Sequence, residues 1–199
     1  MGFLEKLLDG AEVEWTPLGD ICNVLRGKRL TKNKLSDEYR FPVFHGGLEP
    51  LGFYDQSNRP ANSTMIINVG ASAGTVGYSH KEFWSSDGCY CISQSEMLNS
   101  NYLFHFLRNI QHQIIGKVRY AGIPTLDAIV VERLLVPIPC PEEPEKSLAI
   151  QGEIVRILDS FTELTAELTA ELTAELEARK KQYNHYRDRL LTFEEGEVE

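Results

Sequence analysis

The chain has 199 residues, 42% of them hydrophobic and 25% charged, which excludes a disordered tail and allows one globular domain plus an additional element. The formal net charge of −9 argues against a protein that holds nucleic acid by bulk electrostatics alone. Apolar runs such as 128–131 end far short of the roughly 18 residues of a membrane helix, and Glu5 and Lys6 stand where a secretory signal would be apolar. We expect a cytoplasmic protein with no membrane partner.

The negative charge is concentrated near the C-terminus. Residues 1–146 carry 14 Lys and Arg against 17 Asp and Glu, a balance of −3, whereas residues 147–199 carry 6 against 12, a balance of −6. Two thirds of the excess therefore lies in the last quarter of the chain.

Residues 26–40 form a basic segment, because they contain six cations and only two acids, Asp37 and Glu38. A second such segment, residues 108–120, carries Arg108, Lys117 and Arg119 with no acid. Either segment alone is more typical of a solvated face than of a binding site. Together they predict a surface on which cations position phosphates while Ser, Asn, Arg or His side chains read base edges.

Short runs of β-forming residues between Gly, Asn, Pro and Asp clusters predict strands in the first 146 residues. The expected strands are 41–44, 64–69, 75–78, 90–92 and 134–138. The glycine-rich run 70–77 follows an expected strand, but its glycines do not have the spacing of a nucleotide-binding motif. We therefore expect a β-turn-β loop there. Cys89 and Cys91 would point to one face of their strand, and we expect all four cysteines to be buried free thiols.

One short helix and one extended connector follow. Asn99 or Ser100 is the expected N-cap of a helix that ends at Gly116, with a buried face formed by Leu103, Phe106, Leu107, Ile110 and Ile114. His105 and His112 would then share one face of this helix, as surface or packing residues. The proline-rich segment 137–144 predicts a stiff, extended connector.

From Ser147 to about Phe193 the only helix breaker is Gly152, and apolar residues recur three or four apart. This predicts one helix of roughly 70 Å, long enough to project from a domain of residues 1–146 and to need a partner helix. The domain boundary is therefore expected after residue 146. Within the helix a Thr-Ala-Glu-Leu unit occurs three times in residues 165–176. The repeat is either a solvated amphipathic surface or a spacer in which each unit adds about 6 Å.

The chain also shows a weak similarity between its two ends. Gly10-Ala11-Glu12-Val13-Glu14 and Gly196-Glu197-Val198-Glu199 both follow a Leu-Leu pair. This suggests that the chain stops where a second copy of the module would begin.

Several kinds of catalytic chemistry lack their motifs in this sequence. It contains no Walker A motif, no carboxylate-x-lysine nuclease ending and no Asn-Pro-Pro-aromatic methylation motif. The five histidines show no metal-ligand spacing. We expect a non-catalytic protein with no cofactor or metal of its own.

Three segments resemble the DNA-specificity subunit of type I restriction-modification enzymes: the join 138–159, the Thr-Ala-Glu-Leu repeat, and the helix end 180–188. The turn 70–77 resembles that of the family's target recognition domain more weakly. The resemblance implies an α+β fold in which a globular mixed α/β recognition domain precedes one long helix. Family members usually carry two of each, so it also implies a half-length form whose two copies pair through antiparallel helices.

The resemblance implies double-stranded DNA, a second copy, modification subunits and restriction subunits as partners. S-adenosylmethionine would be bound by the modification subunit, and ATP and Mg²⁺ by the restriction subunit. The residues expected to contact DNA are Arg26, Lys28, Arg29, Lys32, Lys34, His45, Ser72 and Arg119. The residues expected to form the dimer helix are Ile157, Phe161, Leu164, Leu168, Leu172 and Leu176.

Two other readings remain open at this point. The chain could be a coiled-coil assembly protein whose globular domain binds protein, in which case reversing the charges of Arg26, Lys28 and Arg29 would leave specific DNA binding unchanged. It could also be an inactive fragment, which would be a stable monomer.

Overall fold

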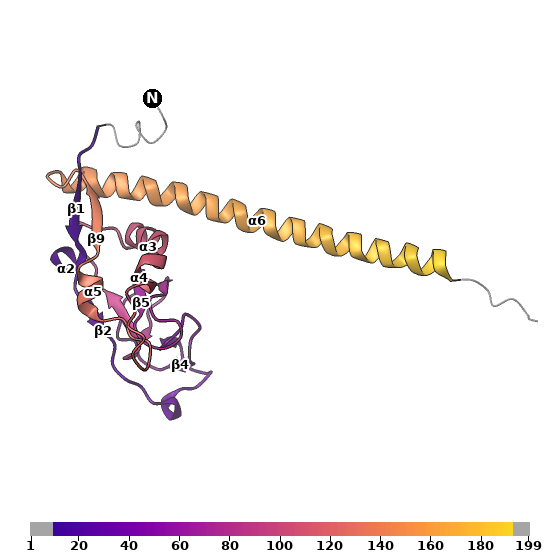
Figure 1. Ribbon diagram of the computed structural model, residues 1–199, viewed down its shortest axis with the longest axis horizontal. Coiled ribbons are helices and arrows are strands. Elements are labelled where there is room, and N and C mark those ends of the chain that lie inside the picture. The colour runs from indigo at the N-terminus through magenta and orange to yellow at the C-terminus, as the bar shows by residue number, and fades with distance from the viewer. Residues whose placement is uncertain (1–9, 193–199) are drawn as a thin grey trace, which may run out of the picture. The chain divides into compact units, whose positions relative to one another are not determined.

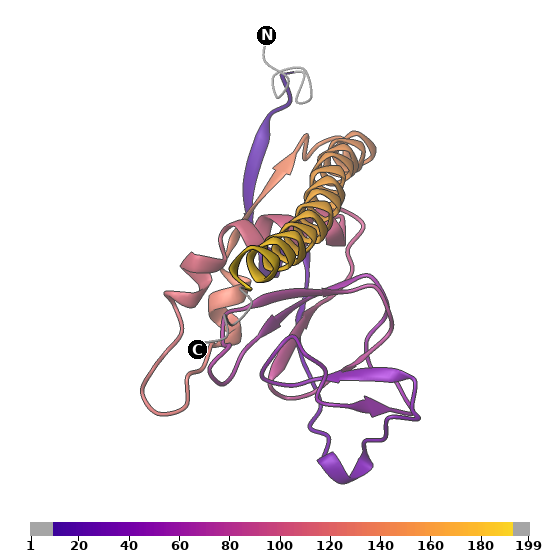
Figure 2. The same cartoon turned by 90° about the vertical axis from the view of Figure 1, so that its right-hand side faces the viewer.

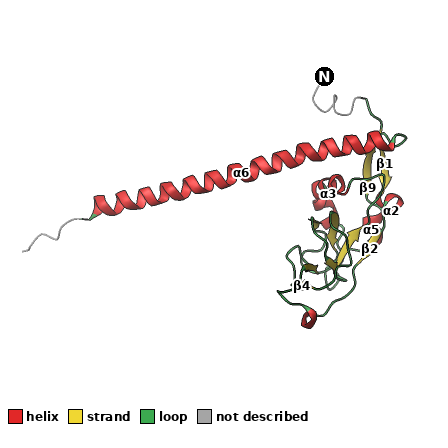
Figure 3. Ribbon diagram, turned by 180° about the vertical axis from the view of Figure 1, so that it is seen from behind, coloured by secondary structure: helices red, strands yellow, loops and turns green. Residues whose placement is uncertain are grey.

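The computed structural model describes residues 10–192, and their contacts divide the chain into a globular unit that ends at Val155 and a helical unit that starts at Arg156. Figures 1 and 3 show the elements of the two units. The strands are β1 (Val13–Pro17), β2 (Val24–Arg26), β3 (Phe41–Phe44), β4 (Phe53–Tyr54), β5 (Ser63–Ile67), β6 (Val76–Ser79), β7 (Trp84–Ser85), β8 (Cys89–Ile92) and β9 (Leu135–Pro139). The helices are α2 (Leu18–Ile21), η1 (Lys32–Lys34), α3 (Ser100–Asn109), α4 (Gln111–Ile115), α5 (Ala128–Glu132) and α6 (Pro144–Leu191).

Three small sheets organise the globular unit, and the largest has the strand order β2-β8-β5-β6. In this sheet β8 pairs antiparallel with both β2 and β5, and β5 pairs antiparallel with β6. The second sheet has the order β4-β3-β7, and the third consists of β1 and β9. All five strands expected from the sequence are present within one or two residues of the expected bounds. The turn between β5 and β6 confirms the β-turn-β loop.

The two faces of β8 contribute to two hydrophobic clusters, because neighbouring side chains on a strand point to opposite faces. Tyr90 and Ile92 pack in the larger cluster with α3, α5 and β9, whereas Cys89 and Cys91 pack in the smaller one with Phe44 and Phe83. This confirms that both thiols share one face. All four cysteines are free and buried.

Burial raises the pKa of Cys89 to about 12 and that of Cys22 to about 11, from a usual value of 9.0. Each thiol binds its proton more tightly in the folded state, so its contribution to stability is present below pH 9 and is lost as the pH rises through the folded-state pKa. Between pH 9 and 11, we expect the free energy of unfolding to fall less for the Cys89→Ala variant than for the wild type. The two pH slopes, measured by urea titration, should differ by about 1 kcal/mol per pH unit. Identical pH slopes for the two proteins would contradict this expectation.

Two helices replace the single helix expected over residues 99–116. Asn99 is the N-cap of α3, and its side chain accepts hydrogen bonds from the backbone N–H groups of Asn101 and Tyr102. The helix then breaks at Ile110, α4 begins at Gln111, and Gly116 ends α4. A long-range contact lies at this break: the Gln111 side chain accepts a hydrogen bond from the N–H of Val76 on β6 at 2.8 Å.

The break also corrects two details of the expected helix. His105 and His112 lie on different helices and do not share one face. The expected buried face is only partly buried: Leu103, Leu107 and Ile114 are buried, whereas Phe106 and Ile110 pack at its edge and are partly exposed.

The proline-rich connector is shorter than predicted, because its first three residues belong to β9. Pro137 pairs with Trp15 on β1, a strand that the sequence did not predict. The N–H of Cys140 donates to the carbonyl of Glu12 at 2.8 Å, and α6 begins at Pro144, earlier than the expected Ser147. Proline is suited to the first turn of a helix because it lacks an N–H that would be unpaired there.

The first three turns of α6 are part of the globular unit. Ser147, Ile150 and Gln151 are buried, and the Gln151 side chain accepts from the N–H of Asn99 at 2.8 Å and donates to the carbonyl of Met97 at 3.0 Å. The contacts thus divide the chain nine residues beyond the boundary drawn from composition, and that boundary stays a prediction. The Glu-Val-Glu repeat at the C-terminus, like Leu7-Leu8, lies outside the described residues.

Candidate nucleic-acid interface

Four chain segments come together at one end of the globular unit, and we call them the loop cluster: residues 45–47, 68–74, 86–88 and 117–126. Backbone hydrogen bonds join them. The carbonyl of Gly88 accepts from Gly46 at 3.4 Å and from Asn68 at 3.2 Å. Asn68 in turn accepts from Leu126 at 2.9 Å, and Gly70 donates to Pro124 at 2.9 Å. Figure 2 shows this end of the unit, where the loop between α4 and α5 lies away from the β1–β9 pair.

His45 holds a defined orientation in the loop cluster. Its Nδ1 accepts a hydrogen bond from the N–H of Gly88 at 3.2 Å and lies 3.3 Å from a carboxylate oxygen of Asp87. These two contacts fix the orientation of the imidazole ring. Glycine is required at position 88 because a Cβ atom there would lie 2.8 Å from Nδ1 of His45.

The other two predicted residues of the loop cluster differ in their electrostatic surroundings. Ser72 lies in the turn between β5 and β6, and its carbonyl accepts from the N–H of Thr75. Arg119 is exposed and forms an ion pair with Asp127, with 3.1 Å between the guanidinium nitrogen and the carboxylate oxygen. This pairing neutralises part of the positive charge that the sequence led us to expect there.

The basic segment 26–34 starts beside the loop cluster. Arg26 pairs with Tyr90 in the central sheet, and the N–H of Lys28 donates to the carbonyl of Ser85 at 2.9 Å. The Arg59 guanidinium donates to the carbonyl of Arg26 at 2.9 Å, and the Trp84 indole donates to the carbonyl of Lys28 at 2.8 Å. Backbone contacts therefore fix the segment while the side chains of Arg26, Lys28 and Arg29 are exposed to solvent.

Gly27 permits this close approach, because a Cβ atom there would lie 2.0 Å from the backbone oxygen of Ser86. We expect Gly27→Ala to lower the free energy of unfolding by about 3 kcal/mol or more, since the neighbouring backbone would have to move. Gly47→Ala is the matched control, because nothing lies within 4 Å of its Cβ position. Equal urea midpoints for the two variants would contradict the close approach.

Lys32 and Lys34 lie on η1, which is attached to the three-stranded sheet. Leu35 packs against Gly52, and the N–H of Ser36 donates to the carbonyl of Phe53 on β4 at 3.0 Å. No hydrogen bond or ion pair among the described residues joins η1 to the loop cluster. The structure thus brings His45, Ser72 and Arg119 together, places Arg26, Lys28 and Arg29 beside Ser85, Ser86 and Tyr90, and holds Lys32 and Lys34 on a separate element.

The residues that sequence reasoning missed here are two buried ones, Asn68 in the loop cluster and Tyr90 next to it on β8. The Tyr90 hydroxyl donates to the carbonyl of Leu126 at 3.2 Å, and burial raises its pKa while a hydrogen bond from Asn68 lowers it. The amide oxygen of Asn68 is buried without a hydrogen-bond partner. Nothing in the spacing of these residues along the chain indicates their contact.

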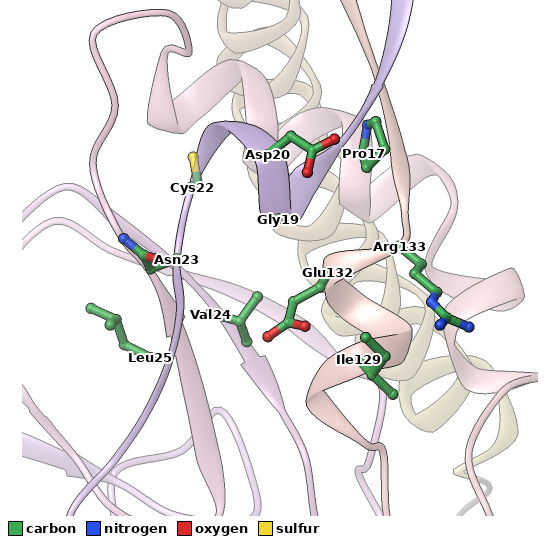
Figure 4. A pocket seen from close by; sticks show the side chains of 10 residues that line it. All are labelled: Pro17, Gly19, Asp20, Cys22, Asn23, Val24, Leu25, Ile129, Glu132 and Arg133. Carbon is green, nitrogen blue, oxygen red and sulfur yellow. The ribbon is translucent and has the colours of Figure 1, made fainter.

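An open pocket of 550 Å³ lies elsewhere on the globular unit, between α2, β2 and α5 (Figure 4). Asp20, Glu132 and Arg133 contribute charge to its lining, and Val24, Leu25 and Ile129 contribute apolar surface. The part of the chain that the structure describes contains no group of three or more residues that could hold a metal ion. No helix within residues 10–192 is long and apolar enough to cross a bilayer.

Comparison with known proteins identifies the family. The family described as the type I restriction modification DNA specificity domain matches residues 11–178. The specificity subunit of the Escherichia coli type I restriction enzymes EcoR124I and EcoR124II is 41% identical over all of this chain and 49% of its own length. The EcoprrI specificity subunit from E. coli is 36% identical over all of this chain and 55% of its own length. The chain thus spans about half the length of these relatives.

A solved structure shows that the fold is also shared. The S subunit of a type I restriction-modification system from M. genitalium superimposes with a TM-score of 0.67 at 20% identity, over 92% of this chain and 46% of that one. The sequence match includes the globular unit and most of α6, and both relatives from E. coli are named as specificity subunits. This chain therefore belongs to the type I restriction-modification DNA specificity family.

Proposed function

We propose that this chain is the DNA-recognition component of a type I restriction-modification system, and that its globular unit binds double-stranded DNA through the loop cluster and the basic segment 26–34. The observation that carries the proposal is the family match over residues 11–178. The loop cluster supports it, because loops held by a fixed scaffold are common sites of recognition. Phosphate contacts would come from Arg26, Lys28, Arg29, Lys32 and Lys34, and base contacts from His45, Ser72 and Arg119.

The proposal includes pairing of two copies through α6. The predicted dimer residues form an apolar row along the helix, and their exposed fractions are 62% for Phe161, 51% for Leu164, 48% for Leu168, 68% for Leu172 and 55% for Leu176. Ile157, at the start of the row, is partly buried. An apolar row of this length that stays exposed in the monomer is typical of an interaction surface. Helix α6 of a second copy would cover it.

Charge along α6 supports an antiparallel arrangement of the two copies. Residues 163–177 carry five acids and no cation, whereas residues 179–189 carry five cations and one acid. Antiparallel helices would place the acidic block of one copy beside the basic block of the other, and parallel helices would place like charges together. A twofold dimer presents two identical recognition surfaces, so it would bind a palindromic target in two separated halves.

Methyl transfer and cleavage would be supplied by other subunits in this proposal. A modification subunit would bind S-adenosylmethionine, and a restriction subunit would use ATP and Mg²⁺. The part played by this chain is to select the DNA sequence and hold those subunits there, with no catalysis of its own.

Mapping of methylated bases tests the proposal most directly. The full chain is co-expressed with its cognate modification subunit, and the modified sites in the host DNA are read out. We expect a bipartite palindrome with a fixed gap. A non-palindromic site would overturn the homodimer, and the absence of any sequence preference would favour a globular unit that binds protein. A chain that stays monomeric and inactive would favour a fragment without function.

The Thr-Ala-Glu-Leu repeat gives this proposal a quantitative test. Each unit contributes about 6 Å of helix, and successive base pairs of DNA are about 3.4 Å apart. We expect deletion of residues 173–176 to narrow the gap between the two half-sites by at least one base pair and to leave the half-sites unchanged. Replacement of Thr173 and Glu175 by alanine, which keeps the length, is the control. An unchanged gap after the deletion would refute the spacer role.

A further inference from the structure

Tyr120 and Ile123 are the two most exposed large apolar side chains of the globular unit. The exposed fractions are 65% for Tyr120 and 70% for Ile123. They lie at the tip of the loop between α4 and α5. Burial of exposed apolar groups is favourable, so a short loop that keeps two of them in solvent is a candidate contact surface.

The backbone on both sides of this tip is tightly held. Arg119 and Thr125 exchange two backbone hydrogen bonds, of 2.8 and 3.0 Å, and form an isolated β-bridge that closes the loop; we call residues 119–125 the ribbon. Thr125 also pairs with Val69, and the buried residues Val118 and Leu126 anchor the two ends of the loop. The two side chains are therefore presented at a fixed place, beside the turn that carries Ser72.

The surroundings of the tip favour DNA as its occupant. Lys117 and Arg119 lie in the same loop just before the tip, Asp127 pairs with Arg119, and the exposed His45 lies in a neighbouring segment of the loop cluster. An apolar tip with basic residues beside it fits a polyanion that exposes apolar groups. In double-stranded DNA those groups are the C5-methyl groups of thymine in the major groove, which is wide enough to admit a two-stranded ribbon.

We infer that the ribbon enters the major groove and that Ile123 and Tyr120 contact thymine methyl groups, so that this loop reads A·T pairs by apolar contact. The inference rests on the proposed function, because it names the bases that one part of the interface selects.

The test removes single methyl groups from the DNA and single side chains from the protein. Duplexes carry the mapped target, and each thymine in turn is replaced by deoxyuridine, which removes only the methyl group. The affinity of the complex with the modification subunit is measured for the wild type, for Ile123→Ala and for Tyr120→Ala. The control is Ile129→Ala on α5, whose side chain is 49% exposed.

We expect at least one replacement to weaken binding by the wild type about threefold to tenfold, as for loss of one to two buried methyl contacts. The same replacement should not change the DNA affinity of the Ile123→Ala variant or that of the Tyr120→Ala variant. It should lower the DNA affinity of the Ile129→Ala variant as much as it lowers that of the wild type. Equal effects of every replacement on the wild type and on both loop variants would overturn the inference. If Ile123→Ala instead weakens assembly with the modification subunit, the tip contacts protein and the inference is wrong. A wild-type complex without any sequence preference would overturn the proposed function itself.

Discussion

Replacement of Leu168 and Leu172 by glutamate should convert the proposed dimer into a monomer and abolish the proposed modification of the target. Burial of one leucine contributes about 1.5–3 kcal/mol, and each substitution acts in both copies. The two leucines together should therefore weaken association by at least a thousandfold, before the added charge is considered. Sedimentation equilibrium of the purified full chain measures the effect.

A matched pair of substitutions separates this effect from a general effect of charge. Ala166 and Ala170 lie two residues before Leu168 and Leu172, about 160° away around the helix. Ala166→Glu with Ala170→Glu adds the same charge on the opposite face and should leave the dimer intact. Dissociation by both pairs to the same extent, or a monomeric wild type at tens of micromolar, would contradict pairing through the leucine row.

Reversal of charge at Arg26, Lys28 and Arg29 should produce the second large effect, on DNA binding. Each lost phosphate contact reduces the slope of log K against log salt concentration by about 0.9. A dimer loses contacts from both copies, so we expect affinity near 150 mM salt to fall by at least about a hundredfold. Measurement of binding at several salt concentrations gives both the slope and the affinity.

The control makes the same change in net charge elsewhere on the chain. Glutamate at Arg133, Lys146 and Arg156 reverses three cations that lie outside the basic segment and the loop cluster. We expect this variant to keep nearly all of the salt dependence of the wild type. If the variant at Arg26, Lys28 and Arg29 still modifies the same sites, the globular unit binds protein and the DNA interface proposed above is wrong.

Patterns between neighbours in sequence predicted the elements well. The apolar spacing in α6, the Asn99 cap and the strands around β5 and β8 depend on residues a few positions apart, and the structure contains each of them. The short elements α2, β2 and α5, of three to five residues, were missed because they have too few residues to show a period. The strand β1 was missed because its partner, β9, lies more than 100 residues away in the chain.

The candidate site was harder to predict, because long-range backbone contacts assemble it. The sequence indicated cations and loop residues that could touch DNA, but it did not show that His45 lies against Gly88 or that Arg119 pairs with Asp127. It also gave no reason to separate Lys32 and Lys34 from the other cations. The exposed tip at Tyr120 and Ile123 could not be predicted, because the sequence does not show whether an apolar residue is buried or exposed.

The way in which the loop cluster is joined has an evolutionary consequence. Its segments are joined by bonds between backbone groups of Gly46, Asn68, Gly70, Gly88 and their partners, and backbone groups remain when side chains change. Side chains such as those of Ser72, Tyr120 and Ile123 can therefore be replaced at a small cost in stability. A scaffold of this kind separates the selection of a new DNA sequence from the maintenance of the fold, so that target specificity can diversify through single substitutions while the protein stays folded.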